Sequence, residues 1–172
     1  MLFRSVVEHE LDHALETTRT ATDMTGILVH KEYAGDTRVR ALPDQLRQAF
    51  ANLLTNAVQA MKGRGTLRLS TAAKEGDAII RLSDSGTGIA SQHLSKIFDP
   101  FFTTKGQGEG SGLGLTVARR IIRKFGGDIR IESIEGSGTT CIVTLPVLTS
   151  APQEGSWSSS APQSQPQPSH SS

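Results

Sequence analysis

The sequence is poor in cysteine, in aromatic residues and in long apolar runs. Its single cysteine, Cys141, cannot form an internal disulfide, which excludes a disulfide-stapled fold, and we interpret it as a small core residue in a reducing compartment. No stretch reaches the roughly 18 consecutive apolar residues that cross a bilayer, so we expect no membrane contact by this piece. The formal net charge is only +1, so the composition gives no indication of a nucleic-acid partner.

What the sequence does contain is enough apolar material for one folded domain. It has 172 residues, of which 36% are hydrophobic and 20% are charged, the proportions of an ordinary soluble globular domain. Residues 149–172 differ, because they are rich in serine, proline and glutamine and contain a single tryptophan, Trp157. Too little apolar surface is present there to offset chain entropy, so we predict a disordered tail.

Hydrophobic periodicity predicts helices and strands in irregular alternation. Helices are expected at residues 3–24, 43–61 and 112–125. The middle helix has the clearest pattern, because Pro43 suits a first helical turn and the apolar residues fall on one stripe. Strand-like runs lie at 26–34, 37–42, 65–72, 78–84, 128–133 and 139–147. This mixture favours an α/β two-layer sandwich over a doubly wound sheet.

The helix predicted at 43–61 carries a row of side-chain amides away from its apolar stripe. Gln48, Asn52 and Asn56 recur every four residues and therefore share one face. Asn is disfavoured in helix interiors, so its repetition suggests amide oxygens that are offered to a hydrated metal ion or a phosphate group. An ordinary polar outer face is the alternative explanation.

Two glycine-containing segments follow. Asp84 closes a predicted strand, and Gly86 and Gly88 then form a turn in which the backbone can approach a flat ligand and the carboxylate can accept a hydrogen bond from an exocyclic amine. Any tight loop is the alternative for this turn. Further on, a run of glycines leads into the last predicted helix, whose free N–H groups attract phosphate oxygens; they stand at positions 106, 108, 110, 112 and 114. We predict a mobile lid over a polyphosphate, with a flexible linker as the alternative.

In this order the segments resemble the ATP-binding domain of sensor histidine kinases, in the GHKL superfamily. "QAFANLLTNAVQAM" is similar to its N box, "DSGTGI" to its G1 box, "IFDPFFTTK" to its F box, "GSGLGL" to its G2 box and "GSGTT" to its G3 position. The resemblance covers about residues 25–147, and its F box and "NAVQAM" are most similar to the nitrogen-regulation type. The implied fold is the GHKL (Bergerat) sandwich, a mixed sheet covered by helices on one face.

The resemblance also implies cofactors and binding residues. ATP and Mg²⁺ are the implied cofactors, with Asn56 on the metal and the phosphates, Asn52 beside it, and Asp84 on the adenine amino group. The remaining implied residues surround the nucleotide: Gly86 and Gly88 at the adenine pocket, Gly110, Gly112 and Gly114 at the phosphates, Thr139 in a hydrogen-bond network behind the base, and Lys105 at the β- or γ-phosphate. A solvated lysine is the alternative for Lys105.

Asn52 separates this chain from other members of the superfamily. In the heat-shock chaperone and mismatch-repair ATPases, the residue one turn before the metal-binding Asn is a Glu that can activate water. The amide of Asn52 cannot accept a proton near neutral pH. We therefore predict little intrinsic ATP hydrolysis.

The first predicted helix contains two histidine patterns, both within "HELDH" at residues 9–13. Its first three letters are similar to the phosphoacceptor box of histidine kinases, and all five fit the H-E-x-x-H pattern of zinc peptidases. The phosphoacceptor box normally continues with Arg, a small polar residue and Pro, whereas Asp12, His13 and Ala14 follow here, and the 16 residues before the first predicted strand leave no room for a hairpin. The zinc pattern lacks a third ligand. We expect neither activity.

Four basic residues lie close together on the last predicted helix: Arg119, Arg120, Arg123 and Lys124. A solvated surface is the simpler interpretation of such a run. Contact with an acidic patch on a hairpin or another partner is the alternative.

Together these expectations predict three parts: residues 1–24 as a remnant of a dimerisation hairpin and its linker, 25–148 as the ATP-binding kinase domain, and 149–172 as the tail. The domain would bind Mg²⁺-ATP and donate the γ-phosphate to a histidine on the phosphoacceptor hairpin domain of a histidine kinase, serving a response regulator indirectly. Its base would come from that hairpin, so no catalytic residue is named, and its location would be cytoplasmic even where the parent kinase is membrane-anchored. The alternatives are a non-catalytic ATP-gated binding module and a serine-directed GHKL kinase.

Overall fold

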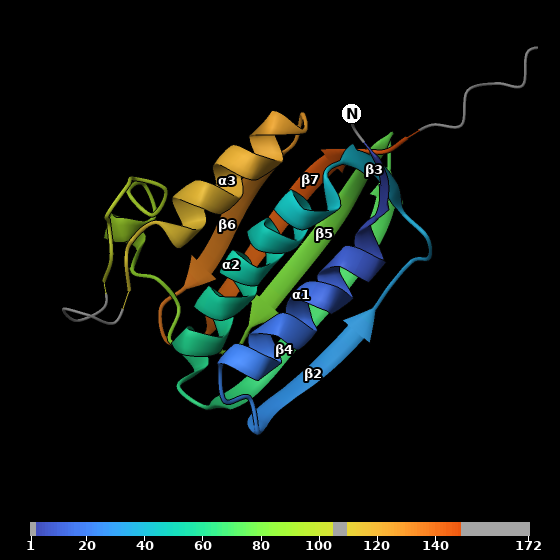
Figure 1. The fold of residues 1–172 in the computed structure, drawn as a ribbon. Helices are drawn as coiled ribbons and strands as arrows, with labels where there is room; N and C mark the ends of the chain where they lie inside the picture. The colour runs from blue at the N-terminus through green and yellow to red at the C-terminus, as the bar shows by residue number, and fades with distance from the viewer. Residues whose placement is uncertain (1–2, 105–109, 149–172) are drawn as a thin grey trace, which may run out of the picture.

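The computed structural model describes residues 3–104 and 110–148, whose helices and strands lie in two layers (Figure 1). The helices are α1 (Val7–Ala21), α2 (Pro43–Met61) and α3 (Gly114–Lys124), with a short 3₁₀ helix, η1, at Ser91–His93. The strands are β1 (Phe3–Val6), β2 (Gly26–Glu32), β3 (Arg38–Ala41), β4 (Arg64–Lys74), β5 (Asp77–Asp84), β6 (Asp128–Ile134) and β7 (Gly138–Pro146). Apart from β1, each of these strands and the three α-helices was predicted from the periodicity.

A five-stranded sheet with the order β2-β4-β5-β7-β6 forms one layer. β2 runs parallel to β4, and the other neighbouring strands are antiparallel, so the sheet is mixed. The helices α1, α2 and α3 lie side by side across one face of this sheet (Figure 1). This arrangement confirms the predicted α/β two-layer sandwich of the GHKL type.

The hydrophobic core lies between the two layers. α2 is the central helix, and its Phe50 and Leu54 have 0% relative exposure. They belong to one buried cluster with Leu67, Leu69 and Ile80 of β4 and β5. Burying a side chain of this size stabilises a fold by about 1.5–3 kcal/mol. The apolar stripe of α2 therefore fixes the helix on the sheet, and with it the orientation of the amide row on another face of the same helix.

The predicted helix from residue 3 is wrong at its start. The first four described residues form β1, antiparallel to β3, and α1 begins only at Val7. Glu8, in the first turn of α1, is buried and accepts hydrogen bonds from the Thr37 backbone N–H at 2.9 Å and from the hydroxyls of Thr37 at 2.8 Å and Thr71 at 2.7 Å. These partners are distant in sequence, and a local apolar spacing cannot reveal them.

α1 shares the helical layer with α2. Leu11 and Leu15 of α1 have 0% relative exposure and belong to the same buried cluster as the α2 stripe. The predicted boundary at residue 24 is therefore not a boundary of packing, because α1 covers part of the common core. That residues 1–24 derive from a dimerisation hairpin stays a prediction from the sequence, and the predicted tail, 149–172, lies outside the described residues.

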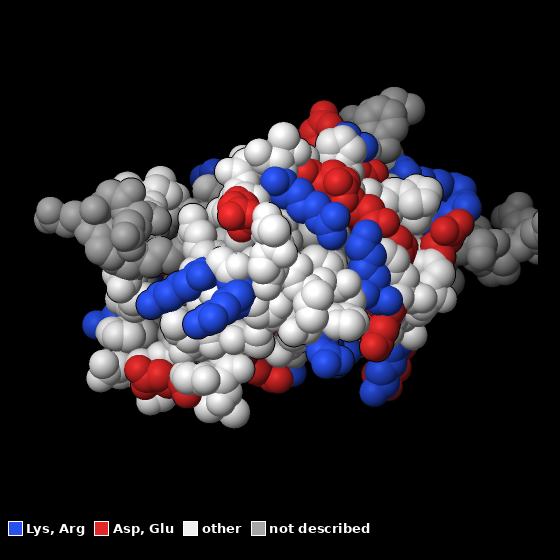
Figure 2. All heavy atoms as spheres, turned by 90° about the horizontal axis from the view of Figure 1, so that it is seen from below, with Lys and Arg blue, Asp and Glu red and all other residues white. Residues whose placement is uncertain are grey.

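The surface mixes charges of both signs. Seen from below the view of Figure 1, basic and acidic side chains alternate over one part of the surface and an uncharged region lies beside them (Figure 2). This face therefore offers no broad patch of one sign. Within residues 3–104 and 110–148, no helix is both long and apolar enough to cross a membrane. The free thiol of Cys141 is buried on β7, as predicted for a core residue.

Candidate functional site

Two of the three predicted amides on α2 face the start of α3. Asn52 and Asn56 are half-buried, whereas Gln48 is exposed. A β-carbon placed on Gly114, the first residue of α3, would lie 3.6 Å from Asn56 Nδ2, 3.9 Å from Asn56 Oδ1 and 4.0 Å from Asn52 Cβ. The amide row therefore meets a helix N-terminus, where the first backbone N–H groups have no partner inside the helix. This half-buried position differs from the fully solvated face that was the alternative.

Asp84 is the last residue of β5 and is half-buried. Its Oδ1 accepts a hydrogen bond from the Gly86 backbone N–H at 2.8 Å. Burial raises the pKa of Asp84 above its usual range, and hydrogen bonds from the backbone N–H groups of Gly86 and Thr139 offset part of that rise. A further N–H donor, brought by a ligand, would stabilise the charged carboxylate and bring this pKa down.

The turn after Asp84 is wedged against the protein itself. A β-carbon at Gly86 would lie 2.6 Å from the carbonyl carbon of Ala60 on α2. Gly88 has φ +67°, and a β-carbon there would lie 2.1 Å from the carbonyl oxygen of Ile134 at the end of β6. Both glycines are thus required by close packing of the protein backbone against itself. The sequence analysis had explained them by the approach of a flat ligand. Their role in shaping an adenine pocket stays a prediction.

Hydrogen bonds join this turn to α2 and to the β6–β7 turn. The Thr87 backbone N–H donates to the Ala60 carbonyl at 3.1 Å, and the Gly136 backbone N–H donates to the Thr87 carbonyl at 2.7 Å. Ala60 lies one helical turn beyond Asn56 on α2. The carboxylate end of the site and the amide row are therefore held to the same helix, about one turn apart.

Thr139 takes part in a hydrogen-bond network on β6 and β7, and its support of an adenine base stays a prediction. Its Oγ1 lies 2.8 Å from the Ser133 hydroxyl, which also donates to the Gly138 carbonyl at 3.0 Å and accepts from the Ile89 backbone N–H at 2.8 Å. The sequence analysis missed Ser133, although the sequence carries a signal for it. Every second residue of β6 faces inward, and Ser133 is a polar residue at the position where this alternation calls for an apolar one.

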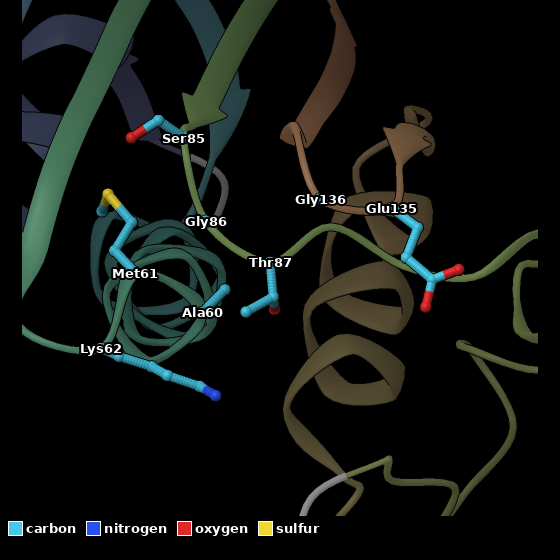
Figure 3. Close-up of a pocket in the computed structure, with 8 residues that line it drawn as sticks. All are labelled: Ala60, Met61, Lys62, Ser85, Gly86, Thr87, Glu135 and Gly136. Atoms are coloured by element: carbon cyan, nitrogen blue, oxygen red, sulfur yellow. The ribbon is translucent and has the colours of Figure 1, made fainter.

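A cavity of about 460 Å³ opens at the C-terminal end of α2 (Figure 3). Its walls are the end of α2, the turn after β5 and the β6–β7 turn, at residues 60–62, 85–87 and 135–136. Lys62 and Glu135 lie on opposite sides of it (Figure 3). The cavity shares Gly86 with the predicted adenine pocket, but Asp84 and the two asparagines do not line it. The cavity and the predicted nucleotide site therefore adjoin without coinciding.

The glycine-rich stretch is described only at its end. Gly112 has φ +66° and accepts a hydrogen bond from the Phe101 backbone N–H at 3.0 Å, and a β-carbon on it would lie 2.4 Å from the Phe101 carbonyl carbon. Phe101 itself has φ 65° and is 74% exposed. Gly110 is exposed, and Lys105 lies outside the described residues. Gly112 is thus required by its contact with the F segment, residues 97–102, whatever it does for a phosphate.

The histidine patterns of the first helix are not assembled into a metal site. His9 and His13 are exposed on α1. The residue between them in the zinc pattern, Glu10, is buried and forms an ion pair with Arg47 of α2. Within the described part of the chain, no three His, Cys, Asp or Glu side chains gather to hold a metal ion. The described residues therefore give no support to the peptidase pattern.

Comparisons with known sequences agree with these motifs. Residues 41–149 match the family described as histidine kinase-, DNA gyrase B-, and HSP90-like ATPases. The chain is 46% identical over 114 residues to the sensor histidine kinase ZraS of Salmonella typhimurium, covering 64% of this chain and 24% of that protein. It is 36% identical over 143 residues to the signal transduction histidine-protein kinase AtoS of Escherichia coli, covering 80% of this chain and 23% of that protein. The chain thus spans about a quarter of the length of these curated relatives.

Solved structures support the same fold. The nucleotide-free catalytic domain of histidine kinase ThkA superposes with a TM-score of 0.75 at 28% identity, covering 85% of this chain and 95% of that chain. The mycobacterial sensor histidine kinase MprB superposes with a TM-score of 0.76, covering 86% of this chain and 98% of that chain. Its identity is 24%, so this second likeness is evidence for the fold alone.

Proposed function

The chain belongs to the family of histidine kinase-, DNA gyrase B-, and HSP90-like ATPases, and on that premise we propose that it is the ATP-binding catalytic domain of a sensor histidine kinase. It binds Mg²⁺-ATP and donates the γ-phosphate to a histidine on a phosphoacceptor hairpin domain. The observation that carries this proposal is the approach of Gly114 to Asn56. It brings the N-terminus of α3 next to a side-chain amide of α2, and Gly114 has no side chain of its own between them.

The residues at that place fit a magnesium-bound polyphosphate. The free N–H groups at the start of α3 suit phosphate oxygens, and the amide oxygen of Asn56 suits Mg²⁺, which usually takes one or two protein oxygens and completes its shell with phosphates and water. When bound, Mg²⁺ neutralises charge on the phosphates. Asn56 is the metal ligand in this proposal, and Asn52, Gly110 and Gly112 border the phosphates. Lys105, outside the described residues, is proposed at the β- or γ-phosphate from the sequence alone.

Asp84 gives the site its preference for adenine. Its carboxylate accepts hydrogen bonds and cannot donate them while ionised, so it suits the 6-amino group of adenine and repels the 6-oxo group of guanine. Gly86 keeps the turn beside it close to α2 and Gly88 keeps it close to the end of β6, and Thr139 holds the β7 side of the pocket. The raised pKa of Asp84 supports this role, because a half-buried carboxylate whose ionised form is disfavoured by burial gains from the further donor that adenine brings.

In this proposal the base for the reaction comes from the acceptor hairpin. An imidazole nitrogen of the acceptor histidine attacks the γ-phosphorus, the bond from phosphorus to the β,γ-bridging oxygen breaks, and ADP leaves with that electron pair. The imidazole proton passes to a base outside this chain. Asn52 cannot take that proton, nor can it activate water, so the bound ATP is hydrolysed slowly. Rapid hydrolysis that survives Asn56→Ala would contradict this part of the proposal.

The test is to incubate the chain with γ-labelled ATP, Mg²⁺ and a separately produced phosphoacceptor hairpin of a histidine kinase. Label on the hairpin that is lost in acid and kept in alkali identifies phosphohistidine and supports the proposal. Label that survives acid indicates the serine-directed kinase, and nucleotide binding without any label indicates the binding module. A hairpin with its histidine replaced by Gln serves as one control and should remain unlabelled. The chain with Asp84→Ala serves as the other and should transfer much less label than the wild type.

In this proposal a response regulator receives the phosphate from the acceptor hairpin and not directly from this chain. The known relatives carry the rest of their length outside the aligned region. The partners of this chain are accordingly the hairpin, which it contacts, and a regulator, which it serves indirectly.

A further inference from the structure

The last helix holds the F segment through one of its arginines. The guanidinium of Arg119 lies over the ring of Phe98, with its central carbon 4.3 Å from the ring centroid. One turn earlier on α3, the Thr116 hydroxyl donates to the Phe98 carbonyl at 3.0 Å. A cation over an aromatic face and a hydrogen bond thus fasten the same residue to α3 at two points.

Arg119 is in turn oriented by the sheet. Asp128, the first residue of β6, accepts from Arg119 Nε at 2.9 Å and from Nη2 at 3.3 Å. It accepts from Arg123 in the same two-point manner, at 3.1 and 3.2 Å. These hydrogen bonds hold the pKa of the Asp128 carboxyl well below its usual range. Asp128 therefore holds the guanidinium plane of Arg119 in the orientation that places it over Phe98.

The basic run of α3 is thus mostly engaged within the domain. Arg119 and Arg123 bind Asp128, and the Lys124 Nζ donates to the Gln45 side chain of α2 at 3.0 Å. Only 28% of the Arg119 side chain is exposed, against 56% of Arg123. Arg120 is exposed, and the described part of the chain gives it no ion pair. Arg119 is therefore partly buried and bound within the domain, and is not simply part of a solvated surface.

The F segment leads back to the candidate site. The Phe101 backbone N–H donates to the carbonyl of Gly112, two residues before α3 begins at Gly114. Contacts therefore run from Asp128 through Arg119 and the F segment to the residues that place Gly114 opposite Asn56. No part of this path includes Asp84 or the turn that follows it.

We propose that Arg119 is a positioning residue for the phosphate end of the nucleotide site: it holds the F segment on α3 and thereby the N-terminus of α3 opposite Asn56. This inference rests on the proposed nucleotide-binding function and assigns Arg119 no contact with the ligand. It follows that Arg119 supports the binding of phosphate-bearing ligands and leaves the binding of the base and ribose unchanged.

The test compares two ligands on one set of variants. Dissociation constants for Mg²⁺-ADP and for adenosine are measured by NMR titration of the whole chain. Arg119→Ala should weaken Mg²⁺-ADP about tenfold, the loss expected from removing a partly buried cation over a ring, and leave adenosine within about twofold. Arg119→Lys should lose nearly as much, because an ammonium can neither bind Asp128 at two points nor stack as a plane. Phe98→Leu should repeat the loss, since it keeps the apolar volume and removes the aromatic face.

Two matched controls lie on the same helix. Arg120→Ala removes an equal charge one residue away and should change neither constant. Arg123→Ala removes the other partner of Asp128 and should weaken Mg²⁺-ADP by less than threefold, because it does not touch the ring. Thermal unfolding of each variant checks that it is folded, and Phe98→Leu, which retains all charges, replaces Arg119→Ala if the latter unfolds.

Equal losses for both ligands in Arg119→Ala, no loss for either, full rescue by Lys, or the same effect in Arg120→Ala would each overturn the proposal. A wild-type chain that binds neither ligand would instead overturn the proposed function. The two failures are therefore distinguishable.

Discussion

The two ends of the candidate site are built in different ways. At the base end, Asp84 stands where strands and turns are joined by backbone hydrogen bonds, and a β-carbon at Gly88 would lie 2.1 Å from a carbonyl oxygen. At the phosphate end, two helices meet through side chains, and a β-carbon at Gly114 would meet no described atom closer than 3.6 Å. At the base end the glycines pack against the protein's own backbone beside a cavity, and at the phosphate end Gly114 makes no contact tighter than van der Waals packing.

The comparison shows that glycines of similar motifs serve different purposes. Gly88 is necessary for the fold, because its conformation and its surroundings both exclude a side chain. Gly114 is dispensable for the fold, because it begins a helix and an added β-carbon would make only ordinary van der Waals contact with Asn56 and Asn52. Substitution should therefore separate stability from binding, and the following changes are arranged from the largest expected effect to the smallest.

Gly88→Ala should have the largest effect, and on stability. The left-handed backbone costs about 1–2 kcal/mol for a residue with a β-carbon, and relieving the contact with Ile134 adds about 1–3 kcal/mol. We expect the free energy of unfolding to fall by about 3 kcal/mol, as measured by urea denaturation.

The matched control for that change is Gly76→Ala. Gly76 has φ +88°, but nothing lies within 4 Å of its β-carbon position, so it carries the backbone cost without the contact. Its loss should be only about 1–2 kcal/mol. Equal losses at the two glycines would show that close packing contributes nothing at the base end.

Asp84→Ala should have the next largest effect, and on binding. A hydrogen bond to a charged group contributes about 1.5–3 kcal/mol, so affinity for Mg²⁺-ADP should fall by roughly ten- to a hundredfold in calorimetry. Affinity for Mg²⁺-GDP should not fall, because the carboxylate repels the guanine oxygen. Asp36→Ala, at an exposed carboxylate in the loop after β2, should leave both affinities unchanged; a loss of GDP binding in Asp84→Ala would argue against base recognition.

Gly114→Ala tests the phosphate end. The added methyl group would make only van der Waals contact with Asn56, and Ala favours a helix more than Gly, so the variant should be as stable as the wild type or more stable by up to about 1 kcal/mol. The methyl occupies the space assigned to phosphate, so Mg²⁺-ADP should bind about tenfold more weakly while adenosine binds unchanged. A stable variant with unchanged ADP affinity would place the phosphates elsewhere.

The sequence predicted the elements well where their pattern is local. α2 begins at Pro43 and ends at Met61, as the apolar stripe indicated, because one helix with one buried face carries its whole signal in its own periodicity. β1 was missed because a four-residue strand next to a helix has too few residues to show its own period. Its identity depends on β3, more than thirty residues away.

Part of the candidate site could also be predicted, because some of its residues lie in local sequence motifs. Motifs brought Asn56, Asp84 and Gly114 forward, and the structure places Gly114 against Asn56 and joins the Asp84 turn to the next turn of α2. Ser133 was overlooked although its polar side chain at an inward position of β6 is visible in the sequence; only its partners, Thr139 and Ile89, are not. Arg119 was not assigned to the site because its packing over Phe98 is a tertiary contact, which no single segment displays.

The smallest expected effects are on stability, and they come from substituting Asp128 and Asp84, two carboxylates whose pKa values are shifted in opposite directions. The lowered pKa of Asp128 means that its ion pairs stabilise the folded chain above the unfolded pKa of about 3.9, and that this contribution is lost as the pH falls from there toward the folded pKa. Because these side chains are half-exposed, Asp128→Asn should cost only about 1 kcal/mol at pH 7, and the cost should disappear in strong acid.

Asp84→Asn should show the opposite sign in the absence of nucleotide. The raised pKa of Asp84 means that its ionised form is less favourable in the folded chain than in the unfolded chain, so the neutral amide should increase the free energy of unfolding at pH 7. That gain should vanish as the pH falls below the unfolded pKa of about 3.9, where the wild-type carboxyl is neutral in both states. Urea denaturation of both variants at several pH values measures the two signs. A destabilised Asp84→Asn would mean that this carboxylate holds the fold together, as Asp128 does, and is not kept for a ligand.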